Sequence, residues 1–221
     1  EGVSELATLL NEYGPRGFDY SCVSDPDLLL NDWPNDPNET TPHYGAGFLF
    51  TTYFLDRFGE EATKAVVADP ANGLDSIDLV LERLNIRDPQ TSQQLTADDV
   101  FADWALANLL QDAKIADGRY SYKSYDPSSV AMDQTISSCQ TEWNSSTVHQ
   151  YGTDYIPLTC SSDYTIEFSG PPTVGVLAID AHSGNYAFWS NKGDESDMRL
   201  TRSFDLDRKS TRLNSSHRIR P

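Results

Sequence analysis

The sequence predicts an α+β protein with more than one domain, in which a helical lobe precedes a β-rich module. Two observations lead to this prediction. Apolar residues recur at helical spacing through the first half of the chain, whereas short segments after about residue 113 alternate between apolar and polar residues. We therefore expect residues 1–112 to form the helical lobe and residues 113–206 to form an incomplete β-rich module.

The first element is a predicted helix over residues 1–13, which ends at Gly14-Pro15. Its apolar positions fall at helical spacing, at Val3, Leu6, Leu9 and Leu10. Residues 14–41 are rich in Pro, Asp and Asn, so we expect a long surface segment with one short helical turn.

Residues 42–59 give the strongest helix prediction. Thr41 is placed to cap it, and Pro42 stands at the first helical position, where its missing N–H costs nothing. Apolar side chains cover most sides of this helix, which predicts that it is buried. Its apolar positions are Ala46, Phe48, Leu49, Phe50, Tyr53, Phe54, Leu55 and Phe58.

Three further helices are expected downstream. Residues 60–68 continue as a short helix, residues 74–84 form another, and the last runs to about residue 111. The last begins with Thr96 and Asp99 in a spacing that resembles a capping box. Strands are then expected within four segments, at 119–125, 155–170, 173–180 and 185–191.

Residues 207–221 are basic and aperiodic, unlike the acidic chain before them. A disordered basic tail or an interaction arm is one interpretation. Residues 207–217, DRKSTRLNSSH, closely resemble the translation of a common sequencing-library adapter. We therefore expect residues 207–221 not to be native, and we expect the rest to be part of a longer protein.

Composition limits the classes of partner. The formal net charge of −18 disfavours nucleic acid, whose phosphates would be repelled, and no apolar run reaches the roughly 18 residues that span a bilayer. Cys139 and Cys160 have a spacing that suits a disulfide, although all cysteines could equally be unpaired, and Cys22 is left without an evident partner. No CxxC pair occurs, which disfavours a structural cysteine–zinc site.

Glu1 and Glu5 are the first candidate functional residues. Four positions apart on a helix, they share one face. An amphipathic helix with two solvated carboxylates would look the same.

Together with the downstream segments, EGVSE resembles a gluzincin-type zinc metallopeptidase. Such enzymes carry HExxH on one helix and a glutamate ligand on the next, in a motif of the form NEGxxE. The order of HYGAGFLFTTYFLDRFGEE, DPANGLDSID and DVFADWALANLL is similar to bacterial secreted peptidases of the immune-inhibitor-A type, and residues 182–206 resemble the start of the β-sandwich module that follows in that group. The resemblance implies the helical lobe of a zincin-like domain followed by an incomplete, jelly-roll-like β-sandwich.

The resemblance also implies roles for individual residues. Glu1 would be the third zinc ligand, and Glu5 would accept a hydrogen bond from a zinc-bound histidine. Tyr44 would donate a hydrogen bond to the oxyanion, and the adjacent His43 could be a second donor; a tyrosine packed at a helix start and a polar surface histidine are the alternatives.

HExxH itself is absent, since no two of the four histidines are four residues apart. We therefore expect two zinc ligands and the general base to lie upstream, together with a signal peptide for secretion to the extracellular space. The chain alone is expected to be inactive, whereas the full protein would hydrolyse peptides or proteins.

Two further interpretations stay open. Asp194 and Asp197, in the acidic segment GDESD, are candidate calcium ligands, although a solvated acidic turn fits equally well. A different class of function is a non-catalytic extracellular binding or adhesion protein, which would grip a protein or glycan through Trp143, Trp189 and nearby tyrosines.

Overall fold

The computed structural model describes residues 1–14, 18–137, 147–157, 165–166, 185–189 and 202–203. The chain divides into two compact units, residues 1–130 and 131–221, and each is described by itself. The first unit is helical, as expected for the lobe. It also contains residues 113–130, which the sequence groups with the β-rich module.

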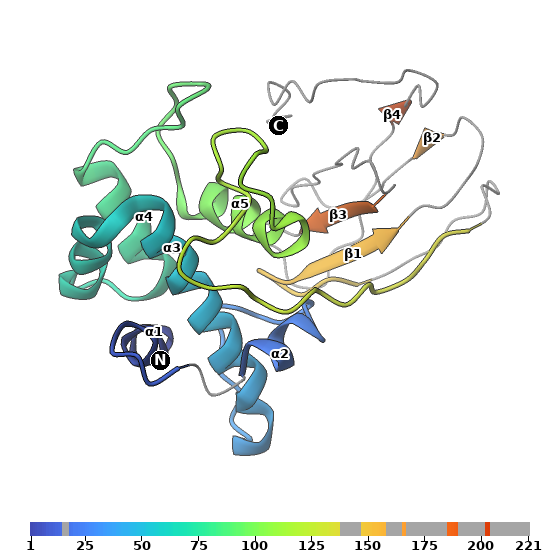
Figure 1. The fold of residues 1–221 in the computed structure, drawn as a ribbon, viewed down its shortest axis with the longest axis horizontal. Helices are drawn as coiled ribbons and strands as arrows, with labels where there is room; N and C mark the ends of the chain where they lie inside the picture. Colours follow the sequence, from blue (N-terminus) through green and yellow to red (C-terminus); the bar gives the residue numbers. More distant parts are fainter. Residues whose placement is uncertain (15–17, 138–146, 158–164, 167–184, 190–201, 204–221) are drawn as a thin grey trace. The chain divides into compact units, whose positions relative to one another are not determined.

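The first unit is arranged around α3 (Thr40–Ala68). Helices α1 (Gly2–Leu10) and α2 (Phe18–Val23) lie on two sides of its first half, as Figure 1 shows. Glycines permit both contacts: a Cβ on Gly2 would stand 2.2 Å from the carbonyl oxygen of Gly47, and one on Gly45 would stand 2.1 Å from that of Phe18. The absence of side chains at these crossings lets the helix backbones touch.

The start of α3 differs from the sequence prediction. The helix begins at Thr40 with Glu39 as its N-cap, and no side chain caps it, so the predicted Thr41 cap is wrong. A 3₁₀ turn, η1 (Pro37–Glu39), immediately precedes the helix, so the chain already turns helically before Thr40. Asp36 caps that turn by accepting a hydrogen bond from the backbone N–H of Asn38 at 2.9 Å.

The two helices predicted over residues 42–68 are found as two helical segments of α3 that meet at a kink. The kink lies at Gly59, whose φ of 82° and ψ of 178° fall outside helical values. A conformation with positive φ of this kind is open to glycine and disfavoured for other residues. Gly59 therefore separates the two helical segments of α3, at the position where the sequence predicted the first to end.

Helices α4 (Gly73–Arg83) and α5 (Ala97–Leu110) complete the lobe. The predicted capping box of α5 is confirmed: the Thr96 hydroxyl accepts from the Asp99 N–H, and the Asp99 carboxylate accepts from the Thr96 N–H. Helices α3, α4 and α5 pack around one core. The apolar positions of α3 in the sequence predicted that this helix would be buried. The most enclosed side chains of the core, each 0% exposed, are Leu49, Tyr53, Val80, Leu81, Val100 and Phe101.

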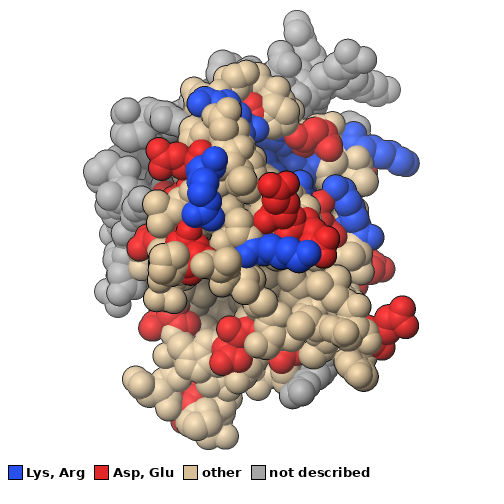
Figure 2. Space-filling view, turned by 90° about the vertical axis from the view of Figure 1, so that its left-hand side faces the viewer, with Lys and Arg blue, Asp and Glu red and all other residues tan. Residues whose placement is uncertain are grey.

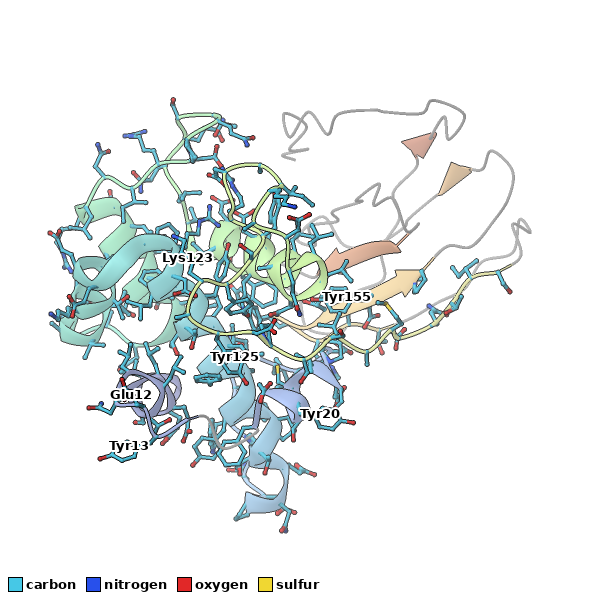
Figure 3. All side chains as sticks on the ribbon, viewed as in Figure 1. Glu12, Tyr13, Tyr20, Lys123, Tyr125 and Tyr155 are labelled. Atoms are coloured by element: carbon cyan, nitrogen blue, oxygen red, sulfur yellow. The ribbon has the colours of Figure 1, made fainter. Side chains whose placement is uncertain are left out.

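Residues 119–125 are not a strand, contrary to the prediction. Their hydrogen bonds go to helices: the Asp56 carboxylate of α3 accepts from the N–H groups of Lys123 and Ser124 at 2.7 and 3.0 Å, and the Tyr122 hydroxyl accepts from Trp104 of α5 at 2.8 Å. The alternating tyrosines point toward helices rather than across a sheet, since Tyr53 contacts Tyr122 and Phe48 contacts Tyr125. Figure 3 shows Tyr125 over the blue half of α3.

The second unit contains short antiparallel strand pairs among its described residues. Strand β1 (Thr153–Pro157) pairs with β3 (Asn185–Trp189), with Tyr155 opposite Ala187, and β2 (Thr165–Ile166) pairs with β4 (Arg202–Ser203). The N–H groups of Asp133 and Ile136 donate to the carbonyls of Tyr155 and Pro157 at 3.0 and 2.9 Å. The predicted strand over residues 173–180 lies outside the described residues.

Within the described part of the chain, none of the helices has the length and apolar character that crossing a membrane requires.

Candidate functional site

The crossing of α1 and α3 brings the predicted site residues toward one place. Gly2 contacts Gly47 directly, and the Thr51 hydroxyl lies 3.0 Å from the Gly2 carbonyl and 2.8 Å from that of Gly47. Glu1 is the residue before this contact, and Tyr44 stands three residues before Gly47. Because one helical turn rises about 5.4 Å, both residues lie within about a turn of the same crossing point.

Glu1 stands at the N-cap position of α1, with an exposed side chain that makes no capping hydrogen bond. Its carbonyl accepts the first helical hydrogen bonds, from Ser4 and Glu5, at 2.8 and 3.2 Å. No salt bridge engages the Glu1 carboxylate among the residues that the structure describes. This carboxylate is therefore accessible to a ligand at the end of the helix.

Glu5 is only 8% exposed, although it lies one turn after the exposed Glu1. No hydrogen-bond or salt-bridge partner for its carboxylate is found within the described ranges. Its carboxylate oxygens are not among the fully enclosed polar atoms without a partner in the described part of the chain, so they keep some contact with solvent. Both interpretations of Glu5, as the partner of a zinc-bound histidine and as a solvated carboxylate, therefore stay open.

Tyr44 and His43 lie in an aromatic cluster at the start of α3. The Tyr44 ring is 5.6 Å from that of Phe18 and 4.8 Å, edge to face, from that of Trp33, which also lies 5.9 Å from the His43 ring. Nδ1 of His43 is enclosed and has no hydrogen-bond partner among the described residues. Tyr44 is thus held by packing, and both interpretations of it stay open.

Most of the other residues singled out in the sequence cannot be compared with this place. Cys139, Cys160, Trp143, Asp194 and Asp197 lie outside the described residues, as does the side chain of Trp189 in β3. Cys22 is a free thiol buried in α2. In the described ranges, no group of three or more His, Cys, Asp or Glu side chains is arranged to hold a metal ion.

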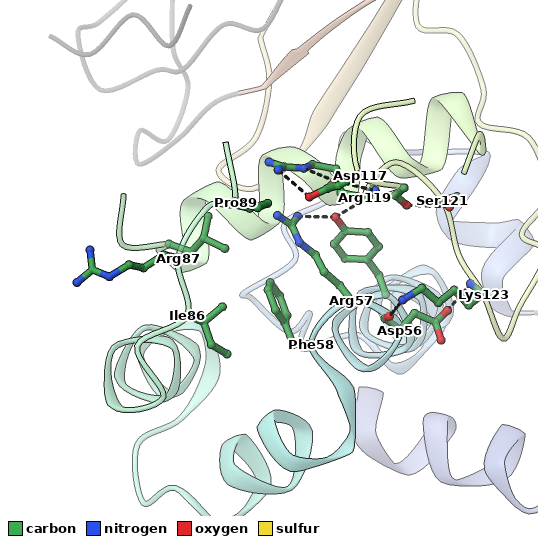
Figure 4. Close-up of a pocket in the computed structure, with 13 residues that line it drawn as sticks. Asp56, Arg57, Phe58, Ile86, Arg87, Pro89, Asp117, Arg119, Ser121 and Lys123 are labelled. Atoms are coloured by element: carbon green, nitrogen blue, oxygen red, sulfur yellow. Dashed lines mark hydrogen bonds and ion pairs between the residues drawn. The ribbon is translucent and has the colours of Figure 1, made fainter. Parts of the chain in front are cut away.

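A pocket of about 270 Å³ lies elsewhere in the first unit, around the second half of α3 (Figure 4). Its walls come from Tyr53 to Phe58, from the loop at residues 86–95 and from residues 117–123. None of the predicted site residues lines it. Sequence reasoning missed this pocket because its three segments are far apart in the chain and carry no shared motif.

A buried ionic network forms one side of the pocket. Arg57 pairs with Asp103, while Arg119 pairs with Asp88 at 2.7 Å and with Asp117 at 2.7 Å. Tyr53 joins the network, because its Oη accepts from Arg57 at 2.7 Å and donates to the Arg119 carbonyl at 2.8 Å. Burial raises the pKa of Tyr53, so its hydroxyl stays protonated.

Charge is unevenly distributed on the surface. In Figure 2, Lys and Arg side chains gather in the upper half of the visible face, whereas the lower half carries Asp and Glu among uncharged residues. The same asymmetry is present in the sequence, where Arg16 is the sole Lys or Arg before Arg57. The end of the lobe that holds Glu1 and Tyr44 is therefore acidic.

Comparison of the chain with known protein families, curated proteins and solved structures finds no match.

Proposed function

We propose that this chain is part of a secreted, gluzincin-type zinc metallopeptidase of the immune-inhibitor-A kind, whose helical lobe is followed by a β-sandwich. One observation carries the proposal beyond the sequence resemblance. The helix that begins with Glu1 crosses the helix that carries Tyr44 at the Gly2–Gly47 contact. The two residues that the resemblance assigns to one active site thus lie close to one crossing.

The residues present fit the edge of a zinc site. Glu1 supplies an accessible carboxylate, which would be one of the three protein ligands of a catalytic zinc. Glu5 is largely covered, and its carboxylate has no partner among the described residues while its oxygens are not fully enclosed, which suits a group that accepts a hydrogen bond from a ligand histidine. The two histidine ligands and the general base would come from a segment of the protein that this sequence does not include.

A zinc ion bound there would lower the pKa of a water molecule and polarise the peptide carbonyl. The residues of this chain would hold the metal and orient its ligands and the substrate. Glu1 would bind the metal, Glu5 would fix the imidazole of a ligand, and Tyr44 would donate a hydrogen bond toward the carbonyl oxygen of the substrate. Packing against Phe18 and Trp33 restricts the Tyr44 ring, which favours such a positioned donor.

The first test is the nucleotide sequence that precedes the Glu1 codon. We expect an in-frame HExxH within some tens of codons. An intact open reading frame without that motif would rule the proposal out.

The second test uses a longer chain that includes the preceding segment. Glu1→Gln should sharply reduce the zinc content, measured by atomic absorption, with Glu12→Gln, an exposed glutamate past the other end of α1, as the matched control. Tyr44→Phe should retain zinc and lower turnover of a peptide substrate, whereas Tyr20→Phe should change neither. Normal zinc content in Glu1→Gln would show that the ligand assignment is wrong.

A further inference from the structure

The pocket around the second half of α3 has a chemistry that the proposed peptidase site does not use. We propose that it binds a small carboxylate with an apolar body, of the size of one aryl acid or one amino-acid side chain. The pocket lies entirely within the first unit, and its volume is about 270 Å³. Ligand pockets typically range from about 300 to 1,000 Å³, so the ligand should be small.

Arg57 provides the central donor. Its side chain is only 9% exposed, and Nη1 makes both of its hydrogen bonds, to Tyr53 and Asp103. Nε and Nη2 have no partner among the described residues, and neither is among the fully enclosed polar atoms there. Because Arg57 lines the pocket, we expect these N–H groups to donate a pair of hydrogen bonds to a carboxylate bound there.

Lys123 provides a second donor on the wall that Figure 4 shows beside Asp56. Its Nζ donates to the backbone carbonyl of Asp56 at 2.6 Å, and no carboxylate lies within ion-pair distance of it in the described part of the chain. The Lys123 side chain is exposed, and its ammonium group has no carboxylate partner among the described residues. An incoming carboxylate would supply that partner.

The acidic residues near the pocket are already engaged. Asp56 accepts from the N–H groups of Lys123 and Ser124 and from the Ser124 hydroxyl. Asp117 and Asp88 are paired with Arg119. A bound carboxylate would therefore meet partnered aspartates rather than free negative charge.

Apolar side chains complete the pocket and define the other end of the ligand. They are Phe58, Ile86, Pro89 and Leu95. Figure 4 shows Phe58 and Ile86 on the side of the pocket opposite Lys123. A ligand that presents its carboxylate to Arg57 and Lys123 could thus place a ring or branched chain against this wall.

The test is a titration of the unmodified chain with 3-phenylpropionate, in which binding is measured by calorimetry or NMR. We expect saturable binding, and we expect 3-phenylpropionamide, which has the same shape without the charge, to bind at least about tenfold more weakly. Lys123→Gln should also weaken binding of the acid by about tenfold. Lys114→Gln removes the same charge from an exposed residue outside the pocket and should leave binding unchanged.

Three outcomes would overturn the proposal: no saturable binding to the folded chain, equal binding of acid and amide, or equal weakening by both lysine variants. The last would indicate general electrostatics rather than a pocket. If circular dichroism shows that Lys123→Gln does not fold, the comparison of acid with amide on the unmodified chain decides the matter.

Discussion

The carboxylate of Asp88 and the guanidinium of Arg119 form an ion pair of 2.7 Å between side chains that are only 4% and 6% exposed. The pair joins the loop after α4 to the segment after α5. The same carboxylate accepts hydrogen bonds from the backbone N–H groups of Gln90 and Thr91 at 2.9 and 2.8 Å. One aspartate thus shapes its own loop and fixes it to another.

This arrangement predicts an acid-sensitive contribution to stability. Burial alone would raise the pKa of Asp88, but the hydrogen bonds from Arg119, Thr91 and Gln90 outweigh it and hold the pKa well below its ordinary value of 3.8. The stabilisation is therefore complete above that value and is lost as the pH falls below it. Asp88→Asn should lower the free energy of unfolding by about 3 kcal/mol at pH 7.

Denaturant unfolding of both proteins between pH 7 and pH 2 checks this prediction. The difference in unfolding free energy between them should narrow below about pH 4, because acid protonates Asp88 in the unfolded chain before it does so in the folded one. Glu82→Gln, at an exposed position on α4, provides the control and should show little difference at any pH. A difference for Asp88→Asn that did not change with pH would contradict the assignment.

Tyr53→Phe tests the hydroxyl at the centre of the same network. The substitution removes the donor to the Arg119 carbonyl and the acceptor for Arg57, while it keeps the fully buried ring. A loss of about 1–3 kcal/mol in unfolding free energy is expected. Tyr20→Phe, whose ring is 67% exposed, should be neutral; an equal effect of both variants would show that the network is not the cause.

Gly2→Ala tests the crossing of α1 with α3. The new Cβ would stand 2.2 Å from the Gly47 carbonyl oxygen, which is too close for any real contact, so α1 must move away. Overpacking of this kind typically costs about 1–3 kcal/mol. Ser4→Ala places the same residue on an exposed position of α1 and should not destabilise the chain; thermal melts would compare the two.

Cys22 should be unreactive while the chain is folded. Burial, with a further effect of Asp19 and Asp25, raises the pKa of its thiol to about 12, which leaves almost no thiolate at pH 8. Iodoacetamide should label Cys22 only after denaturation, as peptide mass mapping would show. Rapid labelling of the native chain would mean that α2 opens readily from α3.

Helices were largely predictable because their evidence is local. The spacing of apolar residues indicated α1, α4 and α5. The capping box at Thr96 also gave the first residue of α5. The start of α3 was misplaced because a 3₁₀ turn, capped by Asp36, precedes the expected Thr41. The alternation of tyrosines in residues 119–125 predicted a strand, whereas the partners of Tyr122 and Tyr125 lie on α3 and α5.

The candidate site was predictable in part for the same reason. Spacing alone placed Glu1 and Glu5 one turn apart, and the structure adds that Glu5 is buried without a partner among the described residues. No sequence pattern could show that Gly2 and Gly47 touch, because that contact depends on tertiary packing. The pocket could not be predicted either, since it needs Arg57, Lys123 and Phe58 brought together from separate segments.

The kink at Gly59 has a stereochemical consequence. A Cβ at this position would meet nothing within 4 Å, so lack of space does not exclude a side chain. The chirality of the residue excludes it instead. With φ near 82° and ψ near 178°, an L-residue is strained, whereas a D-residue lies in the extended region that is ordinary for it. Chemical synthesis with D-alanine at position 59 should therefore preserve the melting temperature, while L-alanine should lower it, and the difference between these two enantiomers would isolate the backbone strain from every other effect.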